Sequence, residues 1–293
     1  MRVVVTGGSG RLGQFVVREL FTHAHQVSAI DTVKPRECPC PTYIVDLCKA
    51  ETLIEQFEKA DAVIHLARQR FPYTESGFNS LTLRWEFTDV AGDAARFSKN
   101  VTMTNNVLAA AQAAGVKKII CGSSLAIYGL YYPVTKLQPD YLAIDEAHPL
   151  RPQDPYGLTK LVAEQLCEAF SQKSDMQIAS LRFSGIYTQE HHALLAERKK
   201  HPTIRGTGAL WSYIDARDAA RACRLALEAD LGGHHAFNIC APDTIMALPT
   251  GELIEKFLPQ VKSVRQAAGR WSGYDTAKAE RVIKFRAKLL LNN

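Results

Sequence analysis

The sequence predicts an α/β protein built on a doubly wound parallel sheet. Short apolar segments alternate with amphipathic ones, which is the order of strands and helices in such a fold. Most of the apolar segments have no polar face, as expected of strands that helices cover on both sides. We expect strands at residues 2–6, 26–30, 42–46, 61–67, 117–124 and 176–183.

The amphipathic segments between these strands predict the helices. They lie at residues 11–21, 49–58, 100–114 and 156–171. After residue 184 the alternation weakens, and we expect a helix at 216–228 and a strand at 235–240 to rejoin the sheet. No pattern assigns residues 68–97. Residues 129–155 contain five prolines and predict a long loop, which in a compact domain is usually functional.

Composition and charge indicate an ordinary globular protein. Of the 293 residues, 46% are hydrophobic and 22% are charged, enough for a sizeable core. The net charge of +5 is modest and the basic residues are scattered, so we expect no nucleic-acid partner. No signal peptide is visible, and no apolar run approaches the roughly 20 residues of a membrane span. We therefore expect a cytoplasmic protein without a membrane partner.

The seven cysteines form no disulfide framework. Cys38 and Cys40 flank one proline but lack a second pair at the spacing of metal ligands. We expect free thiols and no metal site.

A glycine-rich turn follows the first strand in the segment VVVTGGSGRLG. Gly7, Gly10 and Gly13 stand between this strand and the first helix. Glycine lets the backbone turn tightly and approach a pyrophosphate, and the helix N-terminus offers free N–H groups to its charge. In this context the turn predicts a dinucleotide-binding Rossmann domain, although the G-x-x-G-x-x-G spacing differs from the usual G-x-G-x-x-G.

Asp31 ends the second predicted strand. A carboxylate there can accept hydrogen bonds from an adenosine ribose and would repel a 2′-phosphate. Arg11, Lys34 and Arg36 are near enough in the sequence to keep NADP open as an alternative. We predict NAD as the cofactor.

Tyr156 and Lys160 stand four residues apart at the start of a predicted helix, so they share one helix face. A phenol, with a pKa near 10, is a poor base at neutral pH, but a neighbouring ammonium favours the phenolate and makes it a usable proton shuttle. Ser123 and Ser124 end the fifth strand, where hydroxyls face the ligand crevice. Ser124 could hold a substrate oxygen beside Tyr156.

With these motifs in order, the chain resembles the extended short-chain dehydrogenases/reductases, which include the NAD-dependent epimerases and dehydratases. The resemblance spans nearly the whole chain and rests on the segments TGGSGRLG, VDL, VIHLAR, NVTMTNNVLAAA, SSLAIYG, YGLTK, LRFSGIY and YIDARDAARA. It implies that Ser124, Tyr156 and Lys160 form the catalytic triad, with Lys160 also holding the nicotinamide ribose. The cofactor-binding residues that it implies, together with those of the turn, are Gly7, Gly10, Arg11, Leu12, Gly13, Asp31, Asp46, Leu47, Leu66, Ala67, Arg68, Asn100 and Phe183.

In this resemblance Asp46 and Leu47 would flank the adenine, and Leu66 to Arg68 would line the nicotinamide side. Asn100 would support the helix that holds the active site. We expect residues 1–183 with 215–240 to form the cofactor domain. Residues 184–214 with 241–293 would then form a small C-terminal substrate-binding cap.

Three departures from the family pattern bear on the reaction. Related dehydratases carry an Asp-Glu pair after the serine motif, whereas this chain has Leu125 and Ala126, so water elimination is not expected. Nucleotide-sugar epimerases commonly have an arginine that grips the substrate pyrophosphate, whereas this chain has Trp211 and Ser212. Ser184 replaces a common asparagine. The pattern looks closer to members such as uronate dehydrogenase, which act on smaller, nucleotide-free substrates.

These observations predict an oxidoreductase that moves a hydride between NAD and a secondary hydroxyl or ketone of a sugar-like or small polar substrate. The alternative is a nucleotide-sugar epimerase with a retained NAD, similar to UDP-glucose 4-epimerase. A non-catalytic NAD-binding regulator is a third interpretation, which the intact triad disfavours. Apolar residues around most of the helices at 100–114 and 156–170 predict a homodimer, which pairs them in a four-helix bundle in this family.

Overall fold

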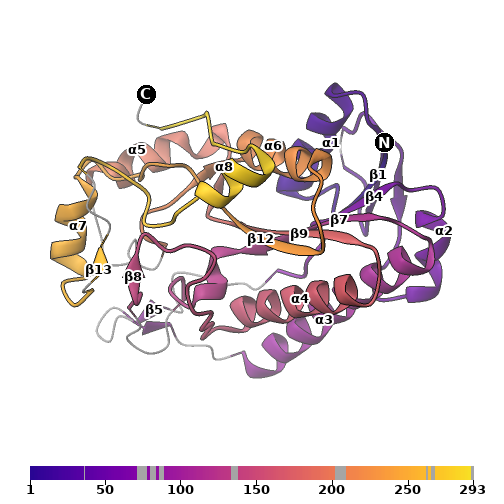
Figure 1. Cartoon of the computed structure of the whole chain (residues 1–293), viewed down its shortest axis with the longest axis horizontal. Coiled ribbons are helices and arrows are strands. Elements are labelled where there is room, and N and C mark those ends of the chain that lie inside the picture. Colours follow the sequence, from indigo (N-terminus) through magenta and orange to yellow (C-terminus); the bar gives the residue numbers. More distant parts are fainter. Residues whose placement is uncertain are drawn as a thin grey trace.

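The computed structural model describes residues 1–35, 37–70, 78–79, 84–85, 89–132, 138–201, 209–261, 263–264 and 268–291. Seven strands form one parallel sheet in the spatial order β12-β9-β7-β4-β1-β2-β3 (Figure 1). Their bounds are β1 (Arg2–Thr6), β2 (Gln26–Asp31), β3 (Thr42–Ile44), β4 (Ala62–His65), β7 (Lys118–Ser124), β9 (Gln177–Phe183) and β12 (His234–Ile239). The predicted doubly wound parallel sheet is thereby confirmed.

The strand order reverses between β1 and β4, which are neighbours in the sheet. From β1 the chain moves outward through β2 to β3, and it then returns to the other side of β1 at β4. The connection from β1 to β2 and the connection into β4 therefore lead to opposite sides of β1. In open α/β sheets such a switch point opens a crevice at the carboxyl ends of the strands, where ligands bind.

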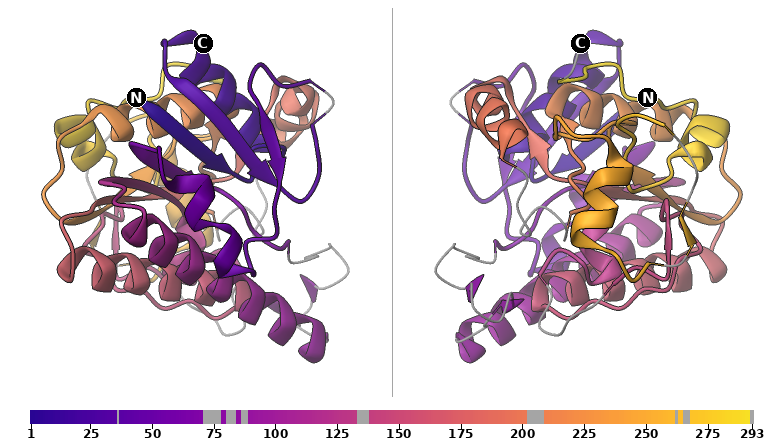
Figure 2. Two further views of the ribbon diagram at one scale, coloured as in Figure 1. Left: turned by 90° about the vertical axis from the view of Figure 1, so that its right-hand side faces the viewer. Right: turned by 90° about the vertical axis from the view of Figure 1, so that its left-hand side faces the viewer.

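Helices cover both faces of the sheet (Figures 1 and 2). One face carries α1 (Arg11–Thr22) and α6 (Ala216–Glu228), and the other carries α2 (Ile54–Phe57), α3 (Val90–Ala113) and α4 (Pro155–Gln172). Successive side chains of β1 point to opposite faces of the sheet: Val3 and Val5 pack in one apolar cluster, and Val4 packs in the other. This two-sided burial is why the strands read as unbroken apolar runs.

Two helices differ from their predicted bounds. Helix α3 begins at Val90, ten residues before the predicted start, and the side chain of Asp89 caps it by accepting a hydrogen bond from the Gly92 N–H at 3.1 Å. Its first turns carry mixed apolar and charged residues, and Val90 and its alanines are exposed, so no buried apolar stripe revealed them in the sequence. The predicted helix at 49–58 is divided into a 3₁₀ turn, η1 (Ala50–Thr52), and the short α2.

Smaller elements gather beyond the carboxyl ends of the strands, at the left of Figure 1. They comprise η3 (Leu125–Tyr128), β8 (Tyr141–Leu142), β10 (Ile186–Tyr187), η4 (Gln189–His191), α5 (His192–Lys200), β11 (Ile214–Asp215), α7 (Thr250–Phe257) and β13 (Ser263–Val264). Helix α8 (Ala277–Ile283) packs against β12 and α6. The apolar core runs from the sheet into this region, through Leu253 and Phe285. The predicted division into a cofactor domain and a cap stays a prediction.

Part of the segment that no pattern assigned contains β5 (Phe78–Asn79) and β6 (Arg84–Trp85), which pair antiparallel. Arg36, which the sequence offered as a cation near the cofactor, lies outside the described residues. All seven cysteines are free, as expected. No helix in the described part of the chain is long and apolar enough to span a bilayer.

Candidate active site

The turn after β1 is shaped by its glycines. Gly7 has φ +75° and donates its N–H to the Ile30 carbonyl at 2.8 Å, and Gly10 donates to the Gly7 carbonyl at 3.0 Å. A Cβ on Gly13 would lie 2.1 Å from the Gly7 oxygen. Gly7 therefore provides the left-handed backbone and Gly13 the close approach that bring the N-terminus of α1 to the sheet edge.

Two carboxylates stand beside this turn. Asp31, at the end of β2, accepts hydrogen bonds from the Ser9 N–H at 3.0 Å and the Thr32 N–H at 2.7 Å. Asp46 follows β3 and accepts from the Cys48 N–H at 3.0 Å, and this bond holds the pKa of the Asp46 carboxyl below its usual value. Both carboxylates are thus fixed at the sheet edge by local backbone groups.

The segment after β4 is fastened by helix α3. The Asn100 side chain accepts a hydrogen bond from the Gln69 N–H at 2.8 Å and donates to the Gln69 carbonyl at 3.1 Å. Asn100 is buried and supports this wall from behind, whereas Leu66, Ala67 and Arg68 face the ligand crevice. The two hydrogen bonds of Asn100 therefore hold the segment after β4 against helix α3.

The Tyr156 and Lys160 pair lies in the first turns of α4. Asp154 caps this helix by accepting from the Gly157 N–H at 2.9 Å, and Pro155 begins it. The Lys160 ammonium donates to the Gly122 carbonyl at 2.6 Å and lies 5.8 Å from the centre of the Tyr156 ring. This bond ties α4 to β7, two residues before Ser124.

One cavity of about 590 Å³ at the carboxyl edge of the sheet brings the predicted residues together. Apart from Asn100, every predicted site residue lines it: Gly7, Gly10, Arg11, Leu12, Gly13, Asp31, Asp46, Leu47, Leu66, Ala67, Arg68, Ser124, Tyr156, Lys160 and Phe183. Their roles in binding and catalysis stay predictions, but residues from the ends of six strands (β1, β2, β3, β4, β7 and β9) share one space. Such convergence is the default mark of a ligand site in this architecture.

A buried polar network stands behind the triad, and sequence reasoning missed it. Glu164 of α4 forms an ion pair with Arg182 of β9, with Nη2 2.7 Å from Oε2 and both side chains only 5% exposed. The Ser123 hydroxyl donates to Glu164 at 2.6 Å, and Arg182 donates to the Tyr128 hydroxyl at 2.8 Å. Burial disfavours the charged guanidinium, but Glu164 outweighs it and holds the pKa of Arg182 above its usual value.

This network joins the elements that carry the site. Ser123 precedes Ser124, Glu164 lies one turn after Lys160, and Arg182 precedes Phe183. The sequence held a weak signal of it, because an arginine in an apolar strand and a glutamate on a buried helix face both require partners. Which charges meet was decided by the packing of α4 on the sheet.

His65, at the end of β4, is a second missed group. Its ring nitrogens bond the Thr6 hydroxyl at 2.7 Å and the Thr104 hydroxyl at 3.3 Å. Burial, with the nearby charge of Lys160, lowers the pKa of His65 to about 3. The imidazole is therefore neutral and braces β4 between β1 and α3.

The wall of the cavity also carries other hydroxyls. Tyr131, Tyr132 and Ser184 line it, and Tyr131 accepts a hydrogen bond from the Gly185 N–H at 3.1 Å. The Ser184 Oγ is buried and has no hydrogen-bond partner among the described residues. An unpaired buried hydroxyl in a cavity wall is suited to bind a polar ligand.

The positions that differ from the family pattern are buried. Leu125 and Ala126, which follow Ser124, are fully buried in η3 and offer no acid or base. Trp211 is 1% exposed, and the Ser212 hydroxyl donates to the Ala209 carbonyl at 2.7 Å. Neither residue presents a cation to the cavity.

Comparison with known proteins agrees with this geometry. Residues 3–240, most of the chain, match the NAD dependent epimerase/dehydratase family. The chain belongs to this family. The predicted resemblance is thus confirmed, and with it an enzyme that uses NAD.

Relatives of this epimerase/dehydratase chain differ in their reactions. L-arabinose 1-dehydrogenase (NAD(P)(+)) of Haloferax volcanii is 27% identical over 235 residues, or 78% of this chain and 84% of that protein. UDP-arabinose 4-epimerase 1 of Arabidopsis thaliana is also 27% identical, over 71% of this chain, but the match spans only 48% of that protein.

Solved structures of the family have the same fold. A short-chain dehydrogenase/reductase superfamily protein from Agrobacterium tumefaciens, with bound NAD, has a TM-score of 0.72 at 21% identity. The alignment covers 100% of this chain and 94% of that one. At this identity the likeness concerns the fold.

Proposed function

We propose that this member of the epimerase/dehydratase family is an NAD-dependent dehydrogenase of a nucleotide-free, sugar-like substrate. The observation that carries the proposal is the cavity in which Ser124, Tyr156 and Lys160 meet the glycine turn and Asp31. Ser124 would bind the reacting oxygen and Tyr156 would take its proton. NAD, held by the glycine turn and Asp31, supplies the hydride acceptor.

Lys160 has two tasks in this proposal. Its bond to the Gly122 carbonyl fixes the ammonium 5.8 Å from the centre of the Tyr156 ring, beside the residue that would take the substrate proton. The remaining ammonium hydrogens can hold a ribose hydroxyl of the cofactor. Phe183, on the same wall, would pack against the nicotinamide.

Two observations favour a small substrate over a nucleotide sugar. Trp211 and Ser212, where a pyrophosphate-binding arginine would stand, are buried and uncharged. The arabinose dehydrogenase, which acts on a free sugar by its name, is matched over 84% of its length, against 48% for the UDP-arabinose epimerase and 76% for UDP-glucose 4-epimerase of Corynebacterium glutamicum. The fully buried Leu125 and Ala126 leave no acid–base pair for dehydration.

Nucleotide-sugar 4-epimerisation is the second candidate. It begins with the same hydride transfer to NAD and ends with return of the hydride to the other face of the ketone. Tyr131, Tyr132 and Ser184 form a polar part of the cavity wall, beside which a keto sugar could turn. The two reactions differ in whether NADH is released.

The deciding experiment follows NADH absorbance with free aldoses, uronates and UDP-sugars as substrates. Net NADH from a free sugar or uronate supports the dehydrogenase. Interconversion of UDP-sugars without net NADH would replace it with the epimerase. If NAD binds but no compound of either class reacts, both candidates are rejected, and a non-catalytic NAD-binding protein becomes the better hypothesis.

We also propose NAD over NADP, because the Asp31 carboxylate at the end of β2 would repel a 2′-phosphate. The cofactor domain would comprise residues 1–183 with 215–240, and the remaining segments would form the substrate cap. The modest net charge and the absence of a membrane-spanning helix among the described residues are compatible with a cytoplasmic enzyme without nucleic-acid partners.

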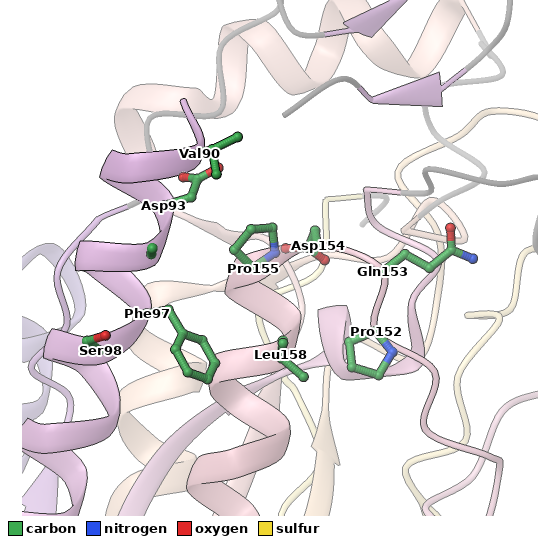
Figure 3. Close-up of a pocket in the computed structure, with 10 residues that line it drawn as sticks. Val90, Asp93, Phe97, Ser98, Pro152, Gln153, Asp154, Pro155 and Leu158 are labelled. Carbon is green, nitrogen blue, oxygen red and sulfur yellow. The ribbon is translucent and has the colours of Figure 1, made fainter. Parts of the chain in front are cut away.

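A homodimer through α3 and α4 is the proposed assembly. Val107 and Leu108, two of the apolar residues that predicted it, are buried against the sheet, but Val90 is 75% exposed and Leu158 is 42% exposed. These two side chains and Phe97 line an open groove of about 440 Å³ between the helices (Figure 3). Light scattering at micromolar concentration tests the assembly: a mass near 32.4 kDa, one chain, would reject the dimer.

A further inference from the structure

Two thiols in the loop between β2 and β3 lie in contact. The Sγ atoms of Cys38 and Cys40 are 3.4 Å apart, and both residues are half-buried at the edge of the apolar core. A disulfide bond is about 2.05 Å long, so closing it requires a movement of little more than 1 Å. Glu37 and Pro39, on either side of Cys38, are exposed, so no buried side chain of theirs opposes that movement.

The surroundings of Cys38 favour a reactive thiolate. Burial opposes the charge, but the hydrogen bond from the Cys40 backbone, with smaller effects of the nearby Thr42 hydroxyl, the Cys40 thiol and the positive charge of Arg18, outweighs burial and holds the pKa of Cys38 below its usual value. An open groove of about 310 Å³, lined by Arg18 and Cys38, gives small molecules access to the sulfur. Reactive cysteines occupy electropositive, partly exposed positions of this kind.

Cys40 has the complementary properties. Burial and the neighbouring Cys38 raise the pKa of Cys40 to about 12, so this thiol stays protonated. Its sulfur lies 3.4 Å from the Cys38 sulfur, so it is placed to resolve the first oxidation product there, giving up its proton as it attacks.

We propose that Cys38 and Cys40 form a peroxide-reactive dithiol, in which Cys38 attacks the peroxide and Cys40 closes the disulfide. The Cys38 thiolate attacks one peroxide oxygen, the O–O bond breaks, and the leaving oxygen departs as water or an alcohol after taking a proton. The Cys40 sulfur then attacks the sulfur of the resulting sulfenic acid, and hydroxide leaves with the Cys40 proton as water. The peroxide is reduced by the two electrons that the dithiol loses.

The other cysteines provide internal controls. Cys48 is also half-buried, but burial and the negative charge of Asp46 raise its pKa. The remaining four, Cys121, Cys167, Cys223 and Cys240, are buried. Cys48 is therefore the matched thiol, since it has similar exposure but surroundings that oppose the thiolate.

The experiment uses the full chain, reduced and freed of reductant, with hydrogen peroxide as the probe at pH 7.5. Remaining thiols are blocked with N-ethylmaleimide, and the protein is digested with trypsin. Cleavage after Arg36 and Lys49 puts Cys38, Cys40 and the control Cys48 on one peptide, residues 37–49. Fragment ions then assign each sulfur without any substitution.

The expected product is a peptide that has lost two hydrogens and two labels, with Cys48 still labelled. Cys38 should lose its thiol faster than Cys48, because the surroundings of Cys38 favour the thiolate and those of Cys48 oppose it. Cys40→Ser should leave a sulfenic acid on Cys38 that a dimedone probe traps. Cys38→Ser should slow oxidation of Cys40 by about tenfold or more, and Cys48→Ser should change neither rate.

Three results would overturn the proposal. Cys48 could lose its thiol first, a disulfide could join Cys48 to either partner, or Cys38→Ser could leave Cys40 oxidation at the original rate. None of these readouts depends on the substrate or on catalytic activity, so the proposed dehydrogenase reaction and the dithiol can fail independently.

Discussion

The two halves of the cavity are built in different ways. The cofactor half is built mainly from backbone groups: Gly7, Gly10 and Gly13 lie within one turn and helix start, and Asp31 is held by the N–H groups of Thr32, its neighbour, and of Ser9, 22 residues away. The chemical half depends on contacts between distant segments. Ser123 meets Glu164 across 41 residues, and Tyr128 meets Asn238 across 110.

Because the two halves are built differently, substitutions in them should have different effects. A backbone-built site depends on the conformational freedom of a few glycines, and most side-chain changes around it only adjust affinity. A side-chain network in the core is worth more when complete and costs more when one member is removed, because an unpaired charge or dipole remains buried. Substitutions in the cofactor half should therefore change cofactor affinity, whereas substitutions in the chemical half should lower the reaction rate or the stability of the fold.

The largest expected effect is confined to the chemical half. Tyr156→Phe should lower kcat by roughly 100- to 10,000-fold and leave NAD affinity nearly unchanged, because only the ionisable oxygen is lost. Turnover and NAD titration on the same preparation measure both quantities. Tyr43→Phe, at an exposed tyrosine of β3 that does not line the cavity, is the control and should retain most activity. A Tyr156→Phe enzyme with most of its turnover would contradict the catalytic assignment.

Removing one charge from the buried network tests its long-range construction. Glu164→Gln should destabilise the fold by about 3–5 kcal/mol, because the Arg182 charge stays buried without its partner. Urea unfolding measures the loss. Glu168→Gln on the same helix is the matched control: this carboxylate pairs with His234 but is 46% exposed, so its loss should cost about 1 kcal/mol or less. Equal costs for the two variants would argue against the importance of the network.

The pH dependence of stability probes His65, which lies between the two halves. Its pKa is about 3 in the folded state and about 6.5 when unfolded, so between these values the unfolded chain binds the extra proton. The stability is therefore complete above pH 6.5 and falls as the pH drops toward 3, by about 2 kcal/mol at pH 5.

His65→Asn should remove this part of the pH dependence. Urea unfolding at pH 7.5 and 5.0, compared between the two proteins, isolates it from His148 and His234, whose pKa values burial also lowers. The original protein should lose about 2 kcal/mol more than the variant between the two pH values. Identical losses would mean that folding does not lower the pKa of His65.

The smallest effect is expected in the cofactor half. Asp31→Ala should shift the ratio of NADP to NAD affinity by roughly tenfold toward NADP, because a carboxylate no longer opposes the 2′-phosphate. Cofactor titration gives the ratio. Asp46→Ala serves as the control, since a residue beside the adenine should affect both cofactors alike. If the unmodified enzyme already prefers NADP, the reading of Asp31 is wrong.

The fold and the short motifs of the candidate site could be predicted from the sequence alone. The six predicted strands and the helix and strand that rejoin the sheet are present, because burial on both faces leaves an unbroken apolar pattern. The glycine turn, Asp31 and the Tyr156–Lys160 pair could be singled out because each motif consists of residues close in the sequence or at the end of a predicted strand, and their roles stay predictions. The start of α3 was missed, since its first turns bury no apolar stripe and only Asp89 marks their beginning.

The polar contacts around those motifs could be seen only in the folded structure. Arg182 and Glu164 looked like two unrelated charges until β9 and α4 packed together, and Ser123 looked like a second candidate beside Ser124 until its hydroxyl met Glu164. The contact between Cys38 and Cys40 likewise required the loop geometry. The physical reason is common to all: a periodic pattern reports which side of an element is buried, whereas the pairing of polar groups depends on which elements meet.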